Sequence, residues 1–422
     1  FKDRGQIDES NKTITAITKA NPAVVTSSSH GFENGDFVTI SGVVGMTEVN
    51  NTTFKVSNKT TNTFELQDVD GNNINSSSFT TYSSAGVANR IYQITTEYTT
   101  AQLFDLKFAQ SADVMYLCHP DHEPMKLSRT GHTSWSLTEV DFGITGPYMD
   151  TNTTTTTLTP ASAGAGTGVN ITASSTTGIN NNQGWLTTDV GRTIKFNGGE
   201  AKITARTNST VVVCTIIDAF NNTNATVAFQ LGSFSDTTGF PSSVSFFEQR
   251  LVFAATNDQP QTIFFSKSGD YENMSAGVND DDAMVYTIAS NQVNAIKSMK
   301  ATRTLIVMTT GGEYSVSAGN ASAITPTNIS IVKQSNYGSA GVDALSIGNA
   351  TIFLQRAKRK IRELAYNFDT DGYVAPDLTI LAAHISESGI TQMDYQQEPH
   401  SLSLIHISEP TRPLYISYAV FC

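Results

Sequence analysis

Four short apolar runs recur along the chain at nearly equal intervals. They begin at Val114, Leu251, Leu305 and Ile352, and they lie 52, 54 and 47 residues apart when the 85 residues of 152–236 are left out. Units of about 50 residues with several strands each are typical of propeller blades, because one blade cannot bury both of its faces without neighbours. The spacing therefore predicts a propeller-like core interrupted by an insertion, with a β-sandwich assembly as the alternative.

The stretch Ser245–Met274 indicates what one unit contains. An apolar run, Leu251–Phe253, leads through a polar turn with Asn257 and Pro260 into a second apolar run, Ile263–Phe265. Two β-prone runs separated by turn-forming residues predict an antiparallel hairpin. The aromatic residues in both runs are then packing residues.

The composition favours many short strands. Charged residues make up only 15% of the chain, there are 30 glycines, and Thr, Ser and Asn are abundant. Threonine fits a pleated surface, while Asn and Gly tolerate turn positions with positive φ. We therefore expect an all-β protein: an incomplete β-propeller-like core of roughly 50-residue units with two small inserted β-barrel or sandwich domains.

Charge and cysteine content exclude some classes of function. The net charge of −12 argues against a protein that grips nucleic acid through its phosphates, which requires a basic face. The three cysteines, Cys118, Cys214 and Cys422, are too far apart to suggest a disulfide framework or a four-cysteine zinc site. No run of eighteen apolar residues and no secretory leader is found.

Both ends of the chain are unusual. The first residue, Phe1, is not a methionine, which predicts that the start of the gene is missing. The last segment, LSLIHISEPTRPLYISYAVFC at 402–422, resembles the translation of a sequencing-library adapter. We expect the authentic protein to end near Ser401, so that a fifth unit beginning near residue 400 is cut short.

These patterns predict six segments. They are a truncated start of the core (1–12), a small β-barrel insert (13–88), the first part of the core (89–151), a second small β insert (152–236), the continued core (237–401) and the non-native tail (402–422). The threonines of 153–157 and the glycine-rich stretch 164–168 predict a flexible boundary near the start of the second insert.

The first insert resembles a known module. Residues 14–46 read ITAITKANPAVVTSSSHGFENGDFVTISGVVGM, and strand-like runs follow at 53–56 and 63–66. This sequence resembles that of the small β-barrel module that phage proteins share with the first catalytic-cysteine half-domain of ubiquitin-activating enzymes. Residues 13–88 contain no cysteine. The resemblance therefore implies a β scaffold without ubiquitin chemistry.

Most of residues 91–401 outside the second insert resembles a family of tailed-phage virion proteins. The resemblance rests on phrases such as DLKFAQSADVMYLCHPDHEPMKLSRTGHTSW, FFEQRLVFAATNDQPQTIFFSKSGDYENM and ITQMDYQQEP. The family is similar to the tail tubular or nozzle proteins of short-tailed phages. It implies a hexameric ring of this chain in the phage tail, made in the bacterial cytoplasm, with other tail or adaptor proteins as partners. DNA would pass through the lumen without specific binding.

Other functions remain open. A receptor- or glycan-binding tail protein that contacts the host surface is the first alternative, and a carbohydrate-degrading tail protein is the second, because glycosidase carboxylates can converge from distant positions. The sequence contains no nucleophile elbow, phosphate-binding loop or His-Glu-x-x-His helix. We therefore expect no enzyme, no cofactor and no catalytic residue.

Several clusters carry residue types that bind metals. Cys118, His119, Asp121 and His122, with His132 nearby, match no standard zinc spacing and read as a hairpin turn. Asp68, Asp70 and Asn72 lack the Gly and Glu that a calcium loop requires, and Tyr373 interrupts the ligands after Asp369 and Asp371, so both read as hairpin tips. The triplet 280–282, three aspartates, reads as a solvated loop. We expect no metal.

One basic run could contact a partner. If it forms a strand, Arg356, Lys358, Lys360 and Arg362 point one way and make one cationic face. We prefer a contact with the acidic remainder of a neighbouring subunit. A solvated edge and a DNA contact are the alternatives.

Overall fold

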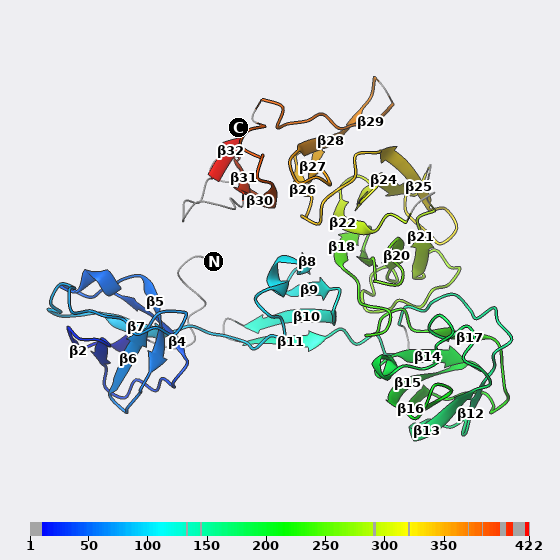
Figure 1. The fold of residues 1–422 in the computed structure, drawn as a ribbon, viewed down its shortest axis with the longest axis horizontal. Helices are drawn as coiled ribbons and strands as arrows, with labels where there is room; N and C mark the ends of the chain where they lie inside the picture. Colours follow the sequence, from blue (N-terminus) through cyan, green and yellow to red (C-terminus); the bar gives the residue numbers. More distant parts are fainter. Residues whose placement is uncertain are drawn as a thin grey trace. The chain divides into compact units, whose positions relative to one another are not determined.

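The computed structural model describes residues 11–131, 134–143, 146–289, 293–319, 321–369, 371–381 and 383–396, and the backbone of 402–407 and 418–421. These residues form strands and three short 3-10 helices, η1 (Thr47–Val49), η2 (Gln102–Phe104) and η3 (Thr187–Asp189). No helix in this part is long and apolar enough to cross a membrane. The chain divides into two compact units, residues 1–97 with 127–137 and residues 98–126 with 138–422 (Figure 1). The all-β prediction is confirmed.

The first unit contains a seven-stranded antiparallel sheet. Its strands are β1 (Lys12–Thr13), β2 (Ala16–Ile17), β3 (Val24–Thr26), β4 (Phe37–Ser41), β5 (Thr52–Ser57), β6 (Thr63–Gln67) and β7 (Val87–Arg90), in the spatial order β1-β7-β4-β5-β6-β3-β2. The two edge strands are joined by only Ile14 and Thr15, which bond to Gly86 and Thr26 on opposite sides. A sheet whose first and last strands are neighbours in the chain must curl, and this explains the barrel-like module.

Alternation of side chains fills this small core. Phe54 and Val56 of β5, and Phe64 of β6, point inward, whereas the residues between them are half-buried or exposed. The ring of His30 is buried and lies 5.1 Å from the ring of Phe64, and its Nδ1 accepts the Phe32 amide at 3.0 Å. His30 is therefore a structural histidine of this core.

The second inserted module lies in the larger unit. Its strands are β12 (Leu158–Pro160), β13 (Gly166–Ala173), β14 (Thr193–Phe196), β15 (Gly199–Arg206), β16 (Val211–Asp218) and β17 (Phe229–Leu231), in the spatial order β12-β13-β16-β15-β14-β17. The flexible boundary predicted at 164–168 is wrong in part. Gly166 pairs with Ile216 at the start of β13, and a register shift before Val169 accommodates the glycines.

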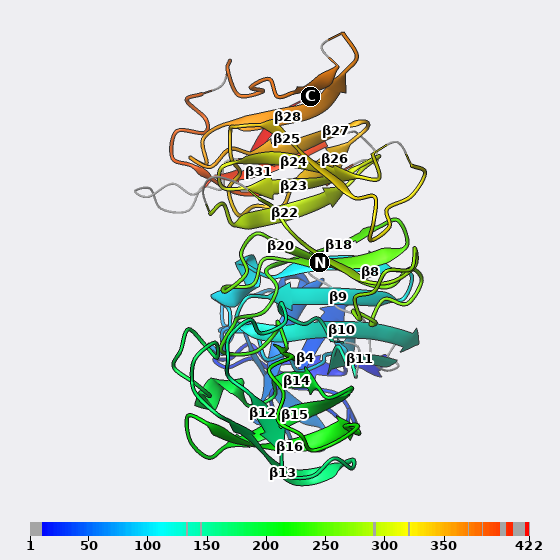
Figure 2. The ribbon, with the colours of Figure 1, turned by 90° about the vertical axis from the view of Figure 1, so that its right-hand side faces the viewer.

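The core consists of successive small meanders. The first group is β8 (Lys107–Ser111), β9 (Val114–His119), β10 (His122–Gly131) and β11 (Ser134–Glu139), and the second is β18 (Ser243–Phe247), β19 (Arg250–Ala254), β20 (Thr262–Phe265) and β21 (Met284–Thr287). The third is β22 (Ile296–Ala301), β23 (Leu305–Thr309), β24 (Gly312–Ser317) and β25 (Ser330–Ser335), and the fourth is β26 (Leu345–Ile347), β27 (Ala350–Leu354), β28 (Ile361–Asn367) and β29 (Gly372–Val374). The last group is β30 (Ile390–Gln396), β31 (Leu402–Ile407) and β32 (Tyr418–Phe421). Each of the first four groups is one four-stranded sheet in chain order, and the last group has three strands. Figure 2 shows the strands of the β22–β25 sheet side by side in yellow.

The four recurring apolar runs are the second strands of these sheets. They are β9, β19, β23 and β27, and every residue of β19 and β23 is buried. A strand that is covered on both faces has no polar side, so it reads as a continuous apolar run. The predicted period of about 50 residues therefore marks one strand per blade, and the propeller-like prediction is confirmed.

Alternate residues of each second strand pack into different cores. In β19, Leu251 and Phe253 pack with Tyr116 of β9, whereas Val252 and Ala254 pack in the cluster that contains Leu305 of β23. The same division occurs in the next two blades. In β23, Leu305 and Val307 pack on one side, and Ile306 and Met308 pack on the other side with Phe353 of β27. In β27, Ile352 and Leu354 pack on the side that faces β30. The second, third and fourth blades thus each share their hydrophobic surface with two neighbours.

The first strands of the blades lie beside one another. β18 lies against both β8 and β22, and β26 lies against β30. From β8, the buried Lys107 reaches the loop before β26, where its Nζ donates to the Gly341 carbonyl at 2.8 Å and lies 3.0 Å from Asp343 Oδ1. First strands that meet while the later strands lie farther out are the arrangement of a propeller.

The fifth sheet begins at Ile390, and its second strand begins at Leu402, close to where the period places the next unit. β31 and β32 therefore lie in the segment that resembles a translated adapter, and β31 pairs with β30 through its backbone. The adapter origin stays a prediction, and residues 1–10 and 408–417 lie outside the described residues.

Candidate functional site: the basic turn and the adjoining pocket

The basic run forms a turn rather than a strand. Arg356, Lys358 and Lys360 lie between β27 and β28, and only Arg362 lies on a strand. Lys358 has φ of 60°, and the Gln355 amide bonds to the Lys360 carbonyl at 2.8 Å, which closes the turn. The left-handed residue interrupts the extended backbone. The single cationic strand face expected from the sequence is therefore wrong.

Three of the four predicted contact residues are bonded within the chain, since Arg356 Nη1 also donates to the Thr310 carbonyl at 3.5 Å. Arg362 Nη1 donates to the Ala375 carbonyl at 2.6 Å, and its guanidinium carbon lies 3.6 Å from the centre of the Tyr337 ring. Lys360 Nζ lies 3.0 Å from Asp377 Oδ2. Arg356 and Lys358 are exposed. A role for any of the four in binding a subunit or DNA stays a prediction.

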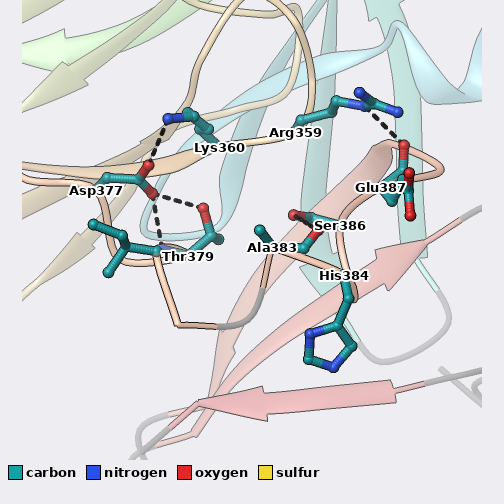
Figure 3. A pocket seen from close by; sticks show the side chains of 9 residues that line it. Arg359, Lys360, Asp377, Thr379, Ala383, His384, Ser386 and Glu387 are labelled. Carbon is teal, nitrogen blue, oxygen red and sulfur yellow. Dashed lines mark hydrogen bonds and ion pairs between the residues drawn. The ribbon is translucent and has the colours of Figure 1, made fainter.

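A pocket of about 440 Å³ opens beside this turn (Figure 3). Its basic side chains are Arg359, Lys360 and His384, and Thr379 and Ile380 also line it. Arg359 Nε donates to the Glu387 carbonyl at 2.8 Å. This bond holds the guanidinium at the pocket, and among the described residues its Nη groups have no hydrogen-bond acceptor. The carboxylates of Asp377 and Glu387 line the pocket as well. The pocket therefore offers both basic and acidic groups beside an apolar surface, and we call it the 359–387 pocket.

The carboxylate in this pocket is held by its neighbours. Burial acts to raise the pKa of Asp377, but hydrogen bonds from Thr379 and from Lys360 outweigh it and hold that pKa below its ordinary value. The Thr379 hydroxyl donates to Asp377 Oδ1 at 2.7 Å and the Thr379 amide does so at 2.9 Å. Asp377 therefore neutralises Lys360, and the other ionisable groups that line the pocket are Arg359, His384 and Glu387.

A second pocket, of about 580 Å³, contains a pair of glutamates that no motif indicated. Glu123 follows the start of β10 and Glu139 ends β11, and the Val140 amide bonds to the Pro124 carbonyl at 2.8 Å, which brings the two together. Lys202 and the ring of Phe142 also line this pocket. Partners 16 residues apart in a long hairpin have no periodic signature, so no sequence pattern indicates this pair.

The paired glutamates predict a pH dependence of stability. Burial, followed by the charge and hydrogen bond of Glu139, raises the pKa of Glu123 to about 7. Because the folded state holds this proton more tightly than the unfolded state, Glu123 contributes to stability when the pH is below the ordinary glutamate pKa of 4.5. This contribution is lost as the pH rises from about 4.5 to about 7. Glu123→Gln should reduce the change in the free energy of unfolding over this pH range by on the order of 1–2 kcal/mol. Partial exposure of the glutamate to solvent makes this smaller than the pKa shift alone implies. Thermal midpoints of the unaltered chain and of the variant between pH 4 and 8 measure this change. Identical pH profiles of the two proteins would contradict the prediction.

The predicted cysteine and histidine cluster forms a hairpin turn, as expected, in which Cys118 and His119 are buried and Asp121 is exposed. Cys118 and His119 end β9, His122 begins β10, and the rings of His119 and His122 lie 5.2 Å apart. Burial raises the pKa of the Cys118 thiol well above its ordinary value and lowers the pKa of His119. No group of three or more metal-ligating side chains occurs among the described residues, and His132 lies outside them.

The two calcium-like sequences form turns. Asp68 Oδ1 accepts the amides of Asp70 and Asn72 at 3.0 and 2.8 Å, and a bridge from Gln67 to Asn73 closes the tip. Asp369 and Asp371 lie between β28 and β29, which pair as a hairpin. Both hairpin-tip predictions are confirmed.

The aspartate triplet is more than a solvated loop. Lys267 Nζ lies 3.0 Å from Asp281 Oδ2 and 3.6 Å from Asp282 Oδ1. The buried Arg250 donates to the carbonyls of all three aspartates. Asp280 and Asp281 are exposed, as expected of a solvated loop, and the triplet in addition anchors the loop before β21 to the blade.

The fold and these sites define an all-β protein with a propeller-like core and two inserted β modules. The family model of the ubiquitin-activating enzyme E1 FCCH domain matches residues 20–91, which confirms the resemblance of the first module. A search of the curated proteins found no match to the chain. The resemblance of the core to phage tail tubular proteins stays a prediction.

Solved structures with distant similarity include two auxiliary nutrient binding proteins. The one from Bacteroides thetaiotaomicron is 8% identical, with 96% of each chain covered and a TM-score of 0.28. The one from Bacteroides ovatus is 9% identical, with 96% of this chain and 83% of that chain covered and a TM-score of 0.25. The endosialidase of phage phi92 is 11% identical, with 96% of this chain and 56% of that chain covered and a TM-score of 0.24. Similarity at this level carries no argument about function.

Proposed function

We propose that the chain is a structural virion protein of a tailed bacteriophage that forms part of the tail tube or nozzle. The observation that carries the proposal is a set of large apolar side chains that the larger unit leaves more than half exposed. They include Leu103, Phe104, Phe108, Phe368, Ile380 and Leu381. Leu103 and Phe104, and likewise Ile380 and Leu381, are neighbours in the chain, and subunits of an assembly cover such exposed apolar side chains against each other.

The charge of the chain is compatible with a DNA conduit. The net charge is −12, so a lumen lined by such subunits repels phosphate and holds DNA weakly. Of the basic residues predicted to touch a partner, Lys360 is neutralised by Asp377 and Arg362 is bound to the Ala375 carbonyl. This arrangement supports passage of DNA without specific binding, in a tail ring with adaptor proteins as neighbours.

The proposal is tested by assembly and by location. The purified chain should form rings without added sugar, which light scattering and negative-stain electron microscopy detect. Mass spectrometry of particles of the parent phage should find the chain in the virion. A protein that stays monomeric at all concentrations and is absent from particles would exclude the structural role.

The second candidate function is glycan binding, favoured by the 580 Å³ pocket. Carboxylates beside the rings of Phe142 and Phe234 offer hydrogen bonds and apolar contact to a sugar. Glu123 and Glu139 are joined by a hydrogen bond, so they are closer than the roughly 5 Å that glycosidase carboxylates need. Binding of the chain to a glycan array, abolished by Phe142→Ala, would favour this function; an array without signal would count against it.

A further inference from the structure

A short apolar projection precedes the first blade. Leu103 and Phe104 are 52% and 75% exposed, and the exposed Asp105 follows them. Their turn, η2, is held in place because Gln102 Oε1 accepts the Thr99 amide at 2.9 Å and its hydroxyl at 3.0 Å. We call residues 103–105 the 103–105 knob. It is a defined turn that presents two apolar side chains beside one negative charge.

The 359–387 pocket has the complementary character. Ile380, which lines it, is 73% exposed, and the adjacent Leu381 is 93% exposed. Arg359 and His384 supply basic groups to the pocket, together with the carboxylates of Asp377 and Glu387 (Figure 3). Neither Leu103 nor Phe104 lines the pocket of its own chain.

We propose that the 103–105 knob of one copy inserts into the 359–387 pocket of a second copy. Phe104 would cover the exposed Ile380 and Leu381, and Asp105 would pair with Arg359, whose Nη groups remain for an acceptor. The inference deepens the proposed function, on which it rests, because it names the surfaces through which the subunits meet.

The contact joins two different surfaces of the chain. A head-to-tail contact of this kind produces a ring when its rotation closes and a filament when it does not. A second copy fits better than a small ligand, because the exposed apolar rim at Ile380 and Leu381 lies partly outside the pocket and needs an apolar partner to cover it. Both surfaces belong to the same chain, so every copy carries one 103–105 knob and one 359–387 pocket.

Charge exchange tests the contact in the complete 422-residue chain. Asp105→Arg and Arg359→Asp should each weaken self-association at least about tenfold, because each places like charges together. The double variant Asp105→Arg with Arg359→Asp should restore association, as should a mixture of the two single variants. Sedimentation velocity over a range of concentrations and salt measures this. Both positions are exposed, so circular dichroism should show an unchanged fold.

Lys19→Asp is the control, since it reverses an exposed charge in the other compact unit, at a residue that does not line the pocket. It should leave association within about twofold, because no partner charge is proposed to face it. Weakening equal to that of Arg359→Asp, or failure of the double variant to associate, would overturn the contact. If the unaltered chain assembles and none of the variants changes assembly, the knob contact fails while the proposed function stands. If the unaltered chain never assembles, the proposed function fails with it.

Discussion

Arg192→Met is expected to destabilise the second inserted module by about 3–5 kcal/mol, because removal of one partner of a buried ion pair leaves an uncompensated charge. Arg192 is 1% exposed. Its Nη1 lies 3.0 Å from Asp189 Oδ1 and 2.8 Å from Asn180 Oδ1, and its Nε donates to the Gly232 carbonyl at 2.8 Å. Asp189 in turn accepts the Leu186 amide at 2.7 Å.

The buried Trp185 reports on this module, because it lies in the same hydrophobic core as β13 to β16. Urea unfolding followed by its fluorescence, with Trp135→Phe in all proteins, measures the change. The control is the double variant Arg192→Met with Asp189→Asn, which removes both charges and should recover about 1–2 kcal/mol of the loss. A double variant less stable than Arg192→Met would show that the charge is not the cause.

Gly338→Ala is expected to destabilise the contact between the third and fourth blades by about 2–4 kcal/mol, because backbone strain and overlap are combined. Gly338 has φ of 73°, and a Cβ atom there would lie 2.3 Å from the Thr310 carbonyl oxygen. Its amide also bonds to the buried carboxyl of Glu313, and the Ser335 hydroxyl donates to the same group. The substitution would displace this connection between β25 and β26.

Gly341→Ala is the matched control, three residues further along the same connection. A Cβ atom at Gly341 would meet nothing within 4 Å, and no positive φ is required there. It should change stability by less than about 0.5 kcal/mol. Hydrogen exchange of β24 and β27, with the thermal midpoint, separates the two variants. Equal effects of both alanines would contradict the steric explanation.

Much of the fold could be predicted, because burial on both faces leaves a clear pattern. Leu251 to Phe253 and the equivalent runs in other blades are continuous apolar strands, so their spacing alone reveals the blades. The amino-acid sequence of the 13–88 segment resembles a known β-barrel module, and the family match at residues 20–91 agrees with this resemblance. The alternating runs at 53–56 and 63–66 are parts of strands β5 and β6.

The candidate sites were predicted less well, because turns have no period. The basic run would make one cationic face only as a strand, and the left-handed Lys358 makes it a turn. That turn directs Arg359, rather than Arg362, to the pocket, and Asp377 and His384 reach it from a later loop. The pairing of Glu123 with Glu139 likewise depends on how β10 and β11 fold back.

The sequence by itself determined the class of fold, the inserted modules and the second strand of each blade, since all three follow from local β propensity and from apolar side chains that must be buried. Only the tertiary structure decided which charges are paired and which remain available. Lys360 is paired with Asp377 and Arg362 with the Ala375 carbonyl, whereas Arg359 lines a pocket and bonds only through its Nε, to the Glu387 carbonyl, among the described residues. Pairing depends on the distance between side chains from separate loops, and that distance is set by the packing of the blades.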